Sequence, residues 1–245
     1  MKEDAYIYDK GDREYTVAVT KRYAEKKYEL DKMLEKLIAP IIKSKELRIL
    51  DAGCGIGHLM AILKEQSPAS MFTGVDQTAF IINEAKKLYG KETGFHFELG
   101  DIEDLPQRYR AAFDVTISRA VLSWLPYYEA HLQALIAVTK KHLFIASLFY
   151  DGDIDFITQV REFKLEAGKK EFSAYQNVYS LPRFTDFLKK NGAKKVSVHP
   201  FEIGIDIPRG DENLMGTYTE KTIDGRHLQI SGAILMSWKW IHIEL

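Results

Sequence analysis

The sequence predicts an α/β fold with a doubly wound, mostly parallel sheet of seven strands. Short apolar strands alternate with helical segments from residue 47 to residue 148, and this alternation places parallel strands between two layers of helices. A glycine-rich turn follows the first strand, as in sheets that bind nucleotides at their carboxyl edge. The chain has 245 residues, 46% of them hydrophobic, which is enough to bury the core of one such domain.

The elements follow in chain order from two periodicities. Apolar positions three and four residues apart predict a helix from Tyr15 to Pro40, where proline interrupts the pattern. Short apolar runs predict strands, and helical spacing predicts the helices between them. The expected strands are 47–50, 71–75, 95–99, 113–118, 143–148 and 195–198, and the other expected helices are 59–64, 80–88, 128–139 and 181–190.

Two segments depart from this alternation. Residues 149–179 show no regular period, so we interpret them as an insertion. In the tail, Asp224-Gly225 lies between 216–221 and 227–230 and predicts a hairpin, and 234–243 predicts one more strand. The expected organisation is an N-terminal helical cap over 1–47, a core over 48–148, an insertion over 149–180, and a C-terminal helix and strands over 181–245 that complete the sheet.

Charge and cysteine content narrow the expected partners. With 34 Lys and Arg against 35 Asp and Glu, no cationic field attracts nucleic acid, and none is expected as an obligate partner. The single cysteine, Cys54, excludes an internal disulfide and fits a reducing compartment. No apolar run approaches the roughly 18 residues of a membrane span. We expect a cytoplasmic protein without membrane contact, and keep a homodimer among the expected states.

The most informative stretch is the turn after the first strand. The strand ends at Asp51 and enters a G-x-G-x-G turn over residues 53–57. A dinucleotide fingerprint needs its third glycine where this chain has His58. A pyrophosphate at the helix N-terminus would also gain nothing from a neighbouring carboxylate. A ligand that carries an ammonium group would instead pair with Asp51.

Two more carboxylates fall at the same edge of the sheet. Asp76 ends the second strand about twenty residues on, where a doubly wound sheet presents an acceptor to ribose hydroxyls. Asp101 follows the third strand; it either accepts from an exocyclic amine or caps the helix that follows, as aspartate often does. Ile102 beside it would pack against a base. These positions predict a site for a nucleoside-like cofactor.

The ordered motifs resemble those of the class I S-adenosylmethionine-dependent methyltransferases, which have a Rossmann-like fold. The resemblance covers residues 48–148 and rests on D-A-G-C-G-I-G at 51–57, V-D at 75–76, G-D-I at 100–102 and F-D-V at 113–115. It implies S-adenosyl-L-methionine as cofactor, with the methionyl end at the turn, the ribose at the second strand and the adenine at the third. The implied cofactor-binding residues are Asp51, Gly53, Cys54, Gly55, Gly57, Asp76, Gln77, Asp101, Ile102 and Ser118.

Departures from the family pattern concern turns and the acceptor. Lys140-Lys141-His142 replaces the usual K-P-G-G turn before the fifth strand, and no N-P-P-Y follows the fourth strand. The second departure disfavours methylation of adenine and cytosine amines. The resemblance implies a methyltransferase that acts on an oxygen or nitrogen of a small polar metabolite and releases S-adenosyl-L-homocysteine. The alternatives are an NAD(P)-dependent reductase and a non-catalytic cofactor-binding or protein-interaction module.

No residue qualifies clearly as a catalytic base. The weak candidates are His131, His199, Tyr179 and His142. They are weak because such residues more often have packing or surface roles. Arg183 either orients an acceptor or is an ordinary surface residue. A lid over the acceptor is expected from the aromatic residues of the cap, the insertion and the tail, namely Tyr6, Tyr8, Tyr15, Tyr175, Tyr179, Tyr218, Trp238 and Trp240. Trp238 and Trp240 also alternate with Lys239, and a strand that faces the core explains them better than a platform for stacked bases.

Two further features favour structural roles. Cys54, between two glycines, is expected to pack rather than react. Asp151, Asp153 and Asp155 crowd one turn but lack the rest of a calcium-loop pattern. A solvated turn is therefore expected there, and no metal site is assigned.

Overall fold

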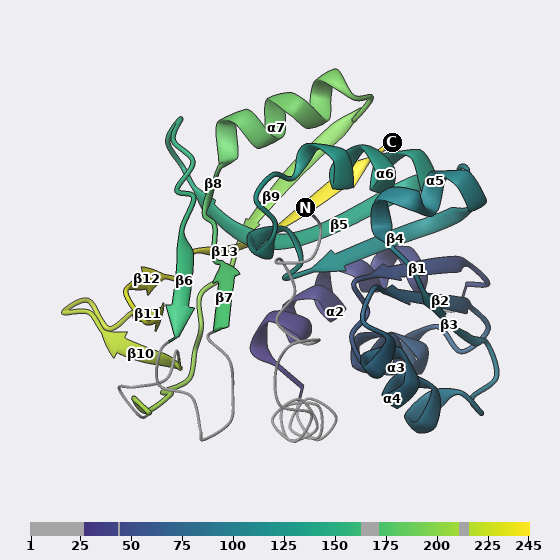
Figure 1. Cartoon of the computed structure of the whole chain (residues 1–245), viewed down its shortest axis with the longest axis horizontal. Coiled ribbons are helices and arrows are strands. Elements are labelled where there is room, and N and C mark those ends of the chain that lie inside the picture. The colour runs from purple at the N-terminus through teal and green to yellow at the C-terminus, as the bar shows by residue number, and fades with distance from the viewer. Residues whose placement is uncertain (1–26, 44, 163–171, 211–215) are drawn as a thin grey trace.

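The computed structural model describes residues 27–43, 45–162, 172–210 and 216–245. A twisted sheet has helices on both faces, and β6, β7 and β10 to β12 lie at one side of it (Figure 1). Tyr6, Tyr8 and Tyr15 of the expected lid lie outside the described residues.

The main sheet confirms the predicted α/β architecture. Strands β3, β2, β1, β4 and β5 are parallel, while β13 is antiparallel to both of its neighbours, β5 and β9. A short eighth strand, β8, pairs with the end of β5. The order across the sheet is β3 (Phe95–Leu99), β2 (Met71–Asp76), β1 (Arg48–Ala52), β4 (Phe113–Arg119), β5 (Thr139–Tyr150), β13 (Trp238–Glu244) and β9 (Lys195–Pro200), with β8 at Tyr179–Ser180.

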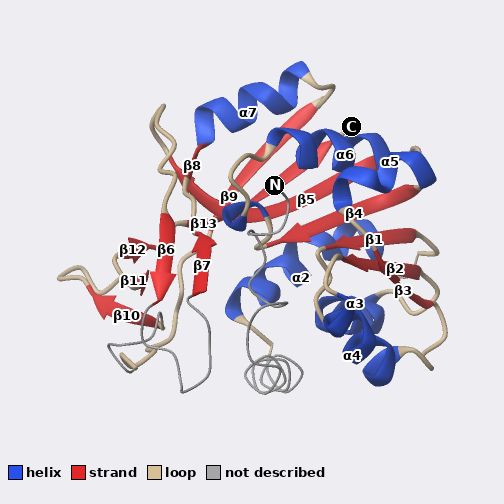
Figure 2. Cartoon of the chain, in the orientation of Figure 1, coloured by secondary structure: helices blue, strands red, loops and turns tan. Residues whose placement is uncertain are grey.

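Each face of the sheet is covered by its own layer of helices (Figure 2). One hydrophobic cluster joins the sheet to α2, α3 and α4, and the other joins it to α5, α6 and α7. The helices are α2 (Glu29–Ile42), α3 (His58–Gln66), α4 (Ala79–Tyr89), α5 (Leu105–Arg108), α6 (Glu129–Val138) and α7 (Leu181–Lys190), with 3-10 turns η1 (Ile102–Asp104) and η2 (Leu122–Trp124). The carboxyl ends of β1, β2 and β4 consequently meet at one edge between the two layers.

Helix α2 continues past the residue at which it was expected to end. Pro40 lies inside the helix, which reaches Ile42. Ile42 is fully buried, and this packing offsets the hydrogen bond that proline removes from the last turn. The indole Nε1 of Trp240 donates to the carbonyl of Leu30 at 3.0 Å. Trp240 is fully buried, so it anchors α2 to β13 and is not part of a lid.

The insertion and the tail contain more strands than expected. Within 149–180, β6 (Gln159–Glu162) and β7 (Phe172–Tyr175) form an antiparallel pair. The predicted hairpin is β10 (Thr217–Lys221) and β11 (His227–Ser231). The single strand expected over 234–243 is instead two strands, because β12 (Ile234–Leu235) pairs with β11 before the chain enters β13.

Two histidines on neighbouring strands make stability depend on pH. His142 Nδ1 lies 3.1 Å from His242 Nε2, and the ring of His242 stacks on Phe144 with centroids 4.3 Å apart. Burial, with a smaller contribution from His142, lowers the pKa of His242 to about 4. A histidine with a lowered folded pKa takes up its proton first in the unfolded chain, so its contribution is present above about pH 6.5 and is lost towards pH 4.

We therefore expect His242→Phe to lose less Tm than the parent protein between pH 7 and pH 5. The ring is half-buried, so solvent screening limits the difference to about 1 kcal/mol, or about 2–4 °C. Thermal unfolding at both pH values measures it, with His199→Gln on the neighbouring strand as the control. Equal Tm losses in all three proteins would contradict the assignment.

Candidate active site

The turn after β1 is shaped by backbone conformations that favour glycine. Gly53, Gly55 and Gly57 have φ values of +80°, +53° and +81°, which side chains with a Cβ rarely adopt. The amides of Gly53 and Cys54 both donate to the carbonyl of Val75, at 2.8 and 3.0 Å. The turn is thereby fastened across the end of β2.

The space around the three glycines differs. A Cβ at Gly53 would lie 2.3 Å from Val121 Cγ2, and one at Gly57 would lie 2.6 Å from the ring of Phe97. A Cβ at Gly55 would meet no atom of the described residues within 4 Å. The outer two glycines are therefore required by packing, whereas Gly55 borders open space that a ligand can approach.

Asp51 is the most unusual group at this edge. It is 3% exposed, and its Oδ2 atom is buried without a hydrogen-bond partner among the described residues. Burial raises the pKa of Asp51 to about 7; nearby Arg119 acts against this rise, whereas Asp31 and Asp76 add to it. A buried carboxylate oxygen without a partner is costly, and a cationic donor is the ligand that would satisfy it.

Asp76 supports the turn from the end of β2. Its Oδ2 accepts from the amide of Gly55 at 3.1 Å, and its Oδ1 accepts from the amide of Thr78 at 2.9 Å. Burial raises its pKa, and these hydrogen bonds oppose the rise. Each carboxylate oxygen has a further lone pair for a ligand hydroxyl. Gln77, next in the chain, is exposed.

The remaining predicted cofactor residues lie at the same edge; one caps a 3-10 turn and the others are buried. Asp101 Oδ1 accepts from the amide of Glu103 at 2.9 Å and so caps η1, which was the competing interpretation of this residue. Ile102 is buried in the core. Cys54 is buried in the opposite core cluster. Ser118 is buried on β4, with no hydrogen-bond partner for its Oγ in the described part of the chain.

Three of the four weak candidates for a base have different surroundings, and the fourth, His142, pairs with His242. His131 lies on α6 with Nδ1 2.8 Å from Glu103 Oε1. His199 lies on β9, which three strands separate from β1, or about 19 Å at the usual strand spacing. Tyr179 is 1% exposed and donates its hydroxyl to the carbonyl of Leu125; burial raises its pKa. Tyr179 is thus a core residue and not part of a lid.

Sequence reasoning missed an ion pair beside Asp51. The Nε atom of Arg119, at the end of β4, lies 2.5 Å from Oδ1 of Asp31 on α2. The guanidinium also lies over the ring of Tyr28, 5.4 Å from its centroid. The position of Arg119 at a strand end was a usable signal, because strand ends form the site. Asp31 gave none, since it occupies what looks like a polar helix position.

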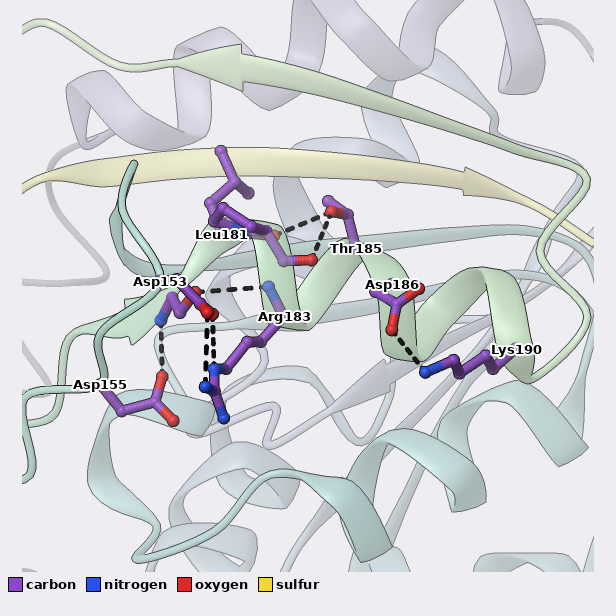
Figure 3. A network of polar contacts seen from close by, with 9 residues as sticks. Asp153, Asp155, Leu181, Arg183, Thr185, Asp186 and Lys190 are labelled. Atoms are coloured by element: carbon purple, nitrogen blue, oxygen red, sulfur yellow. Dashed lines mark hydrogen bonds and ion pairs between the residues drawn. The ribbon is translucent and has the colours of Figure 1, made fainter.

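The acidic turn after β5 is tied down by protein groups. Asp153 pairs with Nε of Arg183 at 2.5 Å, and Asp155 accepts from the amide of Ser180 at 2.6 Å (Figure 3). Asp151 lies 3.2 Å from Nζ of Lys239. The described residues contain no group of three or more potential metal ligands. Arg183 consequently fixes this turn to the start of α7.

Buried oxygens without partners also occur near the ends of β4 and β5. They belong to Ser123 in η2, Ser147 in β5 and Gln176 after β7, and have no hydrogen-bond partner in the part of the chain that the structure describes. The amide of Asn177 donates to the carbonyl of Ser123 at 2.8 Å, so the segment after β7 crosses next to η2. Ser123 is two residues from Val121, whose side chain faces Gly53, so this polar group lies near the glycine turn.

None of the helices within the described ranges combines the length and the apolar character needed to cross a bilayer.

Comparisons with known proteins identify a family over the same region. The sequence model of a family described as "Methyltransferase domain" matches residues 43–195, more than half of the chain. A trans-aconitate 2-methyltransferase from Deinococcus radiodurans is 34% identical over 88 residues, 36% of this chain and 32% of that protein. A tRNA U34 carboxymethyltransferase from Helicobacter pylori is 26% identical over 167 residues, 65% of this chain and 59% of that protein. The chain thus spans about a third to three fifths of these relatives.

A solved structure supports the same fold over nearly the whole chain. Magnesium protoporphyrin IX methyltransferase from Synechocystis PCC 6803, with bound SAH, matches with a TM-score of 0.57 and covers 97% of each chain. At 14% identity, this likeness shows the fold alone.

Proposed function

This chain belongs to the class I S-adenosylmethionine-dependent methyltransferases, and from that membership we propose that it methylates an oxygen or nitrogen of a small polar metabolite. The observation that supports the cofactor site is the unpartnered Oδ2 of Asp51 beside the open space at Gly55. The ammonium of a methionyl group would pair with Asp51, and the rest of that group needs a close approach to the backbone at Gly55. The residues present therefore fit the cofactor.

In this proposal the protein mainly binds and orients the reactants and excludes water from them. When bound, the cofactor would supply an electrophilic methyl group on a sulfonium. An in-line nucleophile would bond to the methyl carbon as the carbon–sulfur bond breaks, and S-adenosylhomocysteine would leave. The chain contributes proximity and exclusion of water. Asp51 would hold the ammonium, Asp76 the ribose hydroxyls, and Asp101 with Ile102 the adenine. An amine acceptor needs only to arrive neutral, whereas an alcohol would need a group that takes its proton.

The buried oxygens near β4 and β5 support a polar acceptor. Ser123, Ser147 and Gln176 offer hydrogen-bond acceptors without partners in the described chain, which favours a metabolite that carries hydroxyl or N–H groups. The relatives differ in their acceptors by name, from trans-aconitate to a tRNA uridine, so they do not select one. The net charge of −1 gives a nucleic-acid acceptor no support.

Thermal unfolding with S-adenosylhomocysteine tests the cofactor. At about 100 times its Kd, the ligand should add about 2.7 kcal/mol, or about 5–10 °C in Tm, and NADH should not. Transfer of a labelled methyl group into a metabolite extract freed of protein and RNA then tests the reaction. A rise in Tm with NADH alone would favour a reductase. A rise in Tm with S-adenosylhomocysteine, without methyl transfer to the metabolite extract or to the protein and RNA removed from it, would favour a non-catalytic module.

A further inference from the structure

Three carboxylates and one guanidinium lie near enough to one another at the glycine turn to interact electrostatically. Asp31 is 1% exposed and Asp51 is 3% exposed, and Asp76 also raises the pKa of Asp51. Ile117 is in register with Asp51, so Arg119 lies two residues further along the neighbouring strand, about 8 Å away between Cα atoms. The carboxylates outnumber the guanidinium, and the site favours a ligand with a positive group next to Asp51.

Arg119 nevertheless keeps part of its donor capacity. Its contact with Asp31 is made through Nε, at 2.5 Å, whereas a guanidinium has five N–H donors in a planar fork. Its side chain is 23% exposed, and the contact of its Nε with Asp31 is an ion pair without hydrogen-bond geometry. Within the described segments its two terminal nitrogens make no hydrogen bond. The buried part of the group is fixed by Asp31, and the exposed part is open to an anion.

We propose that Arg119 binds the carboxylate of the cofactor's α-amino-acid end, and that Asp31 is the positioning residue that orients the guanidinium. This inference rests on the proposed function. An α-amino acid carries its ammonium and its carboxylate on one carbon, so Asp51 and Arg119, at neighbouring strand ends, match the two groups. A fixed planar fork favours two parallel hydrogen bonds to one carboxylate. Asp31 comes from α2, so the helical cap contributes to cofactor recognition.

The test compares two ligands that differ only in the carboxylate. Isothermal titration calorimetry with S-adenosylhomocysteine and its decarboxylated amine, S-adenosyl-3-thiopropylamine, gives an affinity ratio for each variant. We expect the parent protein to prefer the amino acid by at least tenfold. Arg119→Met should bring the ratio within about twofold of one. Asp31→Asn should lower the ratio at least threefold, and Asp31→Glu should restore part of it.

Loss of one partner leaves a buried charge unpaired, which destabilises folds strongly. The double variant Asp31→Asn/Arg119→Met removes both charges and should show the same ratio as Arg119→Met. A parent ratio near one, expected if Arg119 instead holds a carboxylate of the acceptor, would overturn the inference, as would equal losses for both ligands in Arg119→Met. Both results leave the proposed function intact, whereas failure of the parent protein to bind S-adenosylhomocysteine would reject that function first.

Discussion

Asp51→Asn is expected to weaken S-adenosylhomocysteine binding about 100-fold and, at the same time, to raise the Tm of the ligand-free protein at pH 8. The affinity falls because a charge-assisted hydrogen bond to the ligand ammonium is worth about 3 kcal/mol in a buried setting. The stability rises because the wild-type carboxylate is buried with one oxygen unpartnered.

The sign of the stability change follows from the pKa of Asp51, which burial raises from 3.8 to about 7. A carboxyl group with a raised folded pKa stabilises the fold fully below pH 3.8, and this contribution is lost as the pH rises through about 7. At pH 8 the fold therefore contains an unfavourable charge that asparagine lacks. The gain should be about 2 kcal/mol, or about 4–8 °C, since the buried amide also lacks some partners.

Calorimetry at pH 6 and pH 8 gives a second signature of the same group. Affinity of the parent protein for the ammonium-bearing ligand should rise with pH as Asp51 ionises, whereas Asp51→Asn should bind equally weakly at both values. Asp186→Asn, an exposed member of an ion pair on α7, is the matched control and should behave like the parent. Binding by Asp51→Asn within threefold of the parent would show that another group holds the ammonium.

Alanine at the turn glycines should separate folding from binding. Gly57→Ala is expected to cost about 3–4 kcal/mol of stability, because its φ is +81° and its Cβ would lie 2.6 Å from the Phe97 ring in the core. Gly55→Ala has φ +53° but no described atom within 4 Å of its Cβ. It should cost only about 1 kcal/mol, yet its methyl group would occupy ligand space and lower affinity at least tenfold.

Chemical denaturation and titration with S-adenosylhomocysteine measure the two effects separately. Gly53→Ala should resemble Gly57→Ala, with a smaller loss, because the clashing Val121 methyl can shift more readily than a ring. Gly192→Ala is the control for a left-handed glycine in open surroundings far from the site, with φ +99°. Unimpaired binding by Gly55→Ala would mean that the cofactor does not approach this part of the backbone.

Much of the fold and the centre of the site followed from local patterns. Alternating strands and helices define a parallel sheet, and the carboxyl ends of its strands must share an edge. Asp51, the turn and Asp76 could therefore be placed together without knowledge of any long-range contact. The role of Asp101 as a cap was likewise one of two local alternatives, and its amide partner at Glu103 is only two residues away.

The rest depended on which distant residues come into contact. Asp31 occupies a helix position whose partner, Arg119, is 88 residues away in the chain, so no local period marks it as buried. Tyr179 ended a segment without clear periodicity, and only tertiary packing places it in the core. Trp240 stood in a predicted strand, which favoured a core position, but its contact with α2 joins residues that no local pattern connects. Pro40 predicted a helix end, but burial of Ile42 outweighed the local preference.

The bond from Trp240 to the carbonyl of Leu30 also bears on the order in which the protein matures during synthesis. β13 follows every other described element in the chain, yet it lies between β5 and β9 in the sheet. A nascent chain without β13 leaves the edges of both strands unpaired and gives α2 no indole to dock against. The contact between the indole and the helix that carries Asp31 can form only after translation has passed Trp240. If Asp31 orients Arg119 as proposed, we expect this part of cofactor recognition to be completed last.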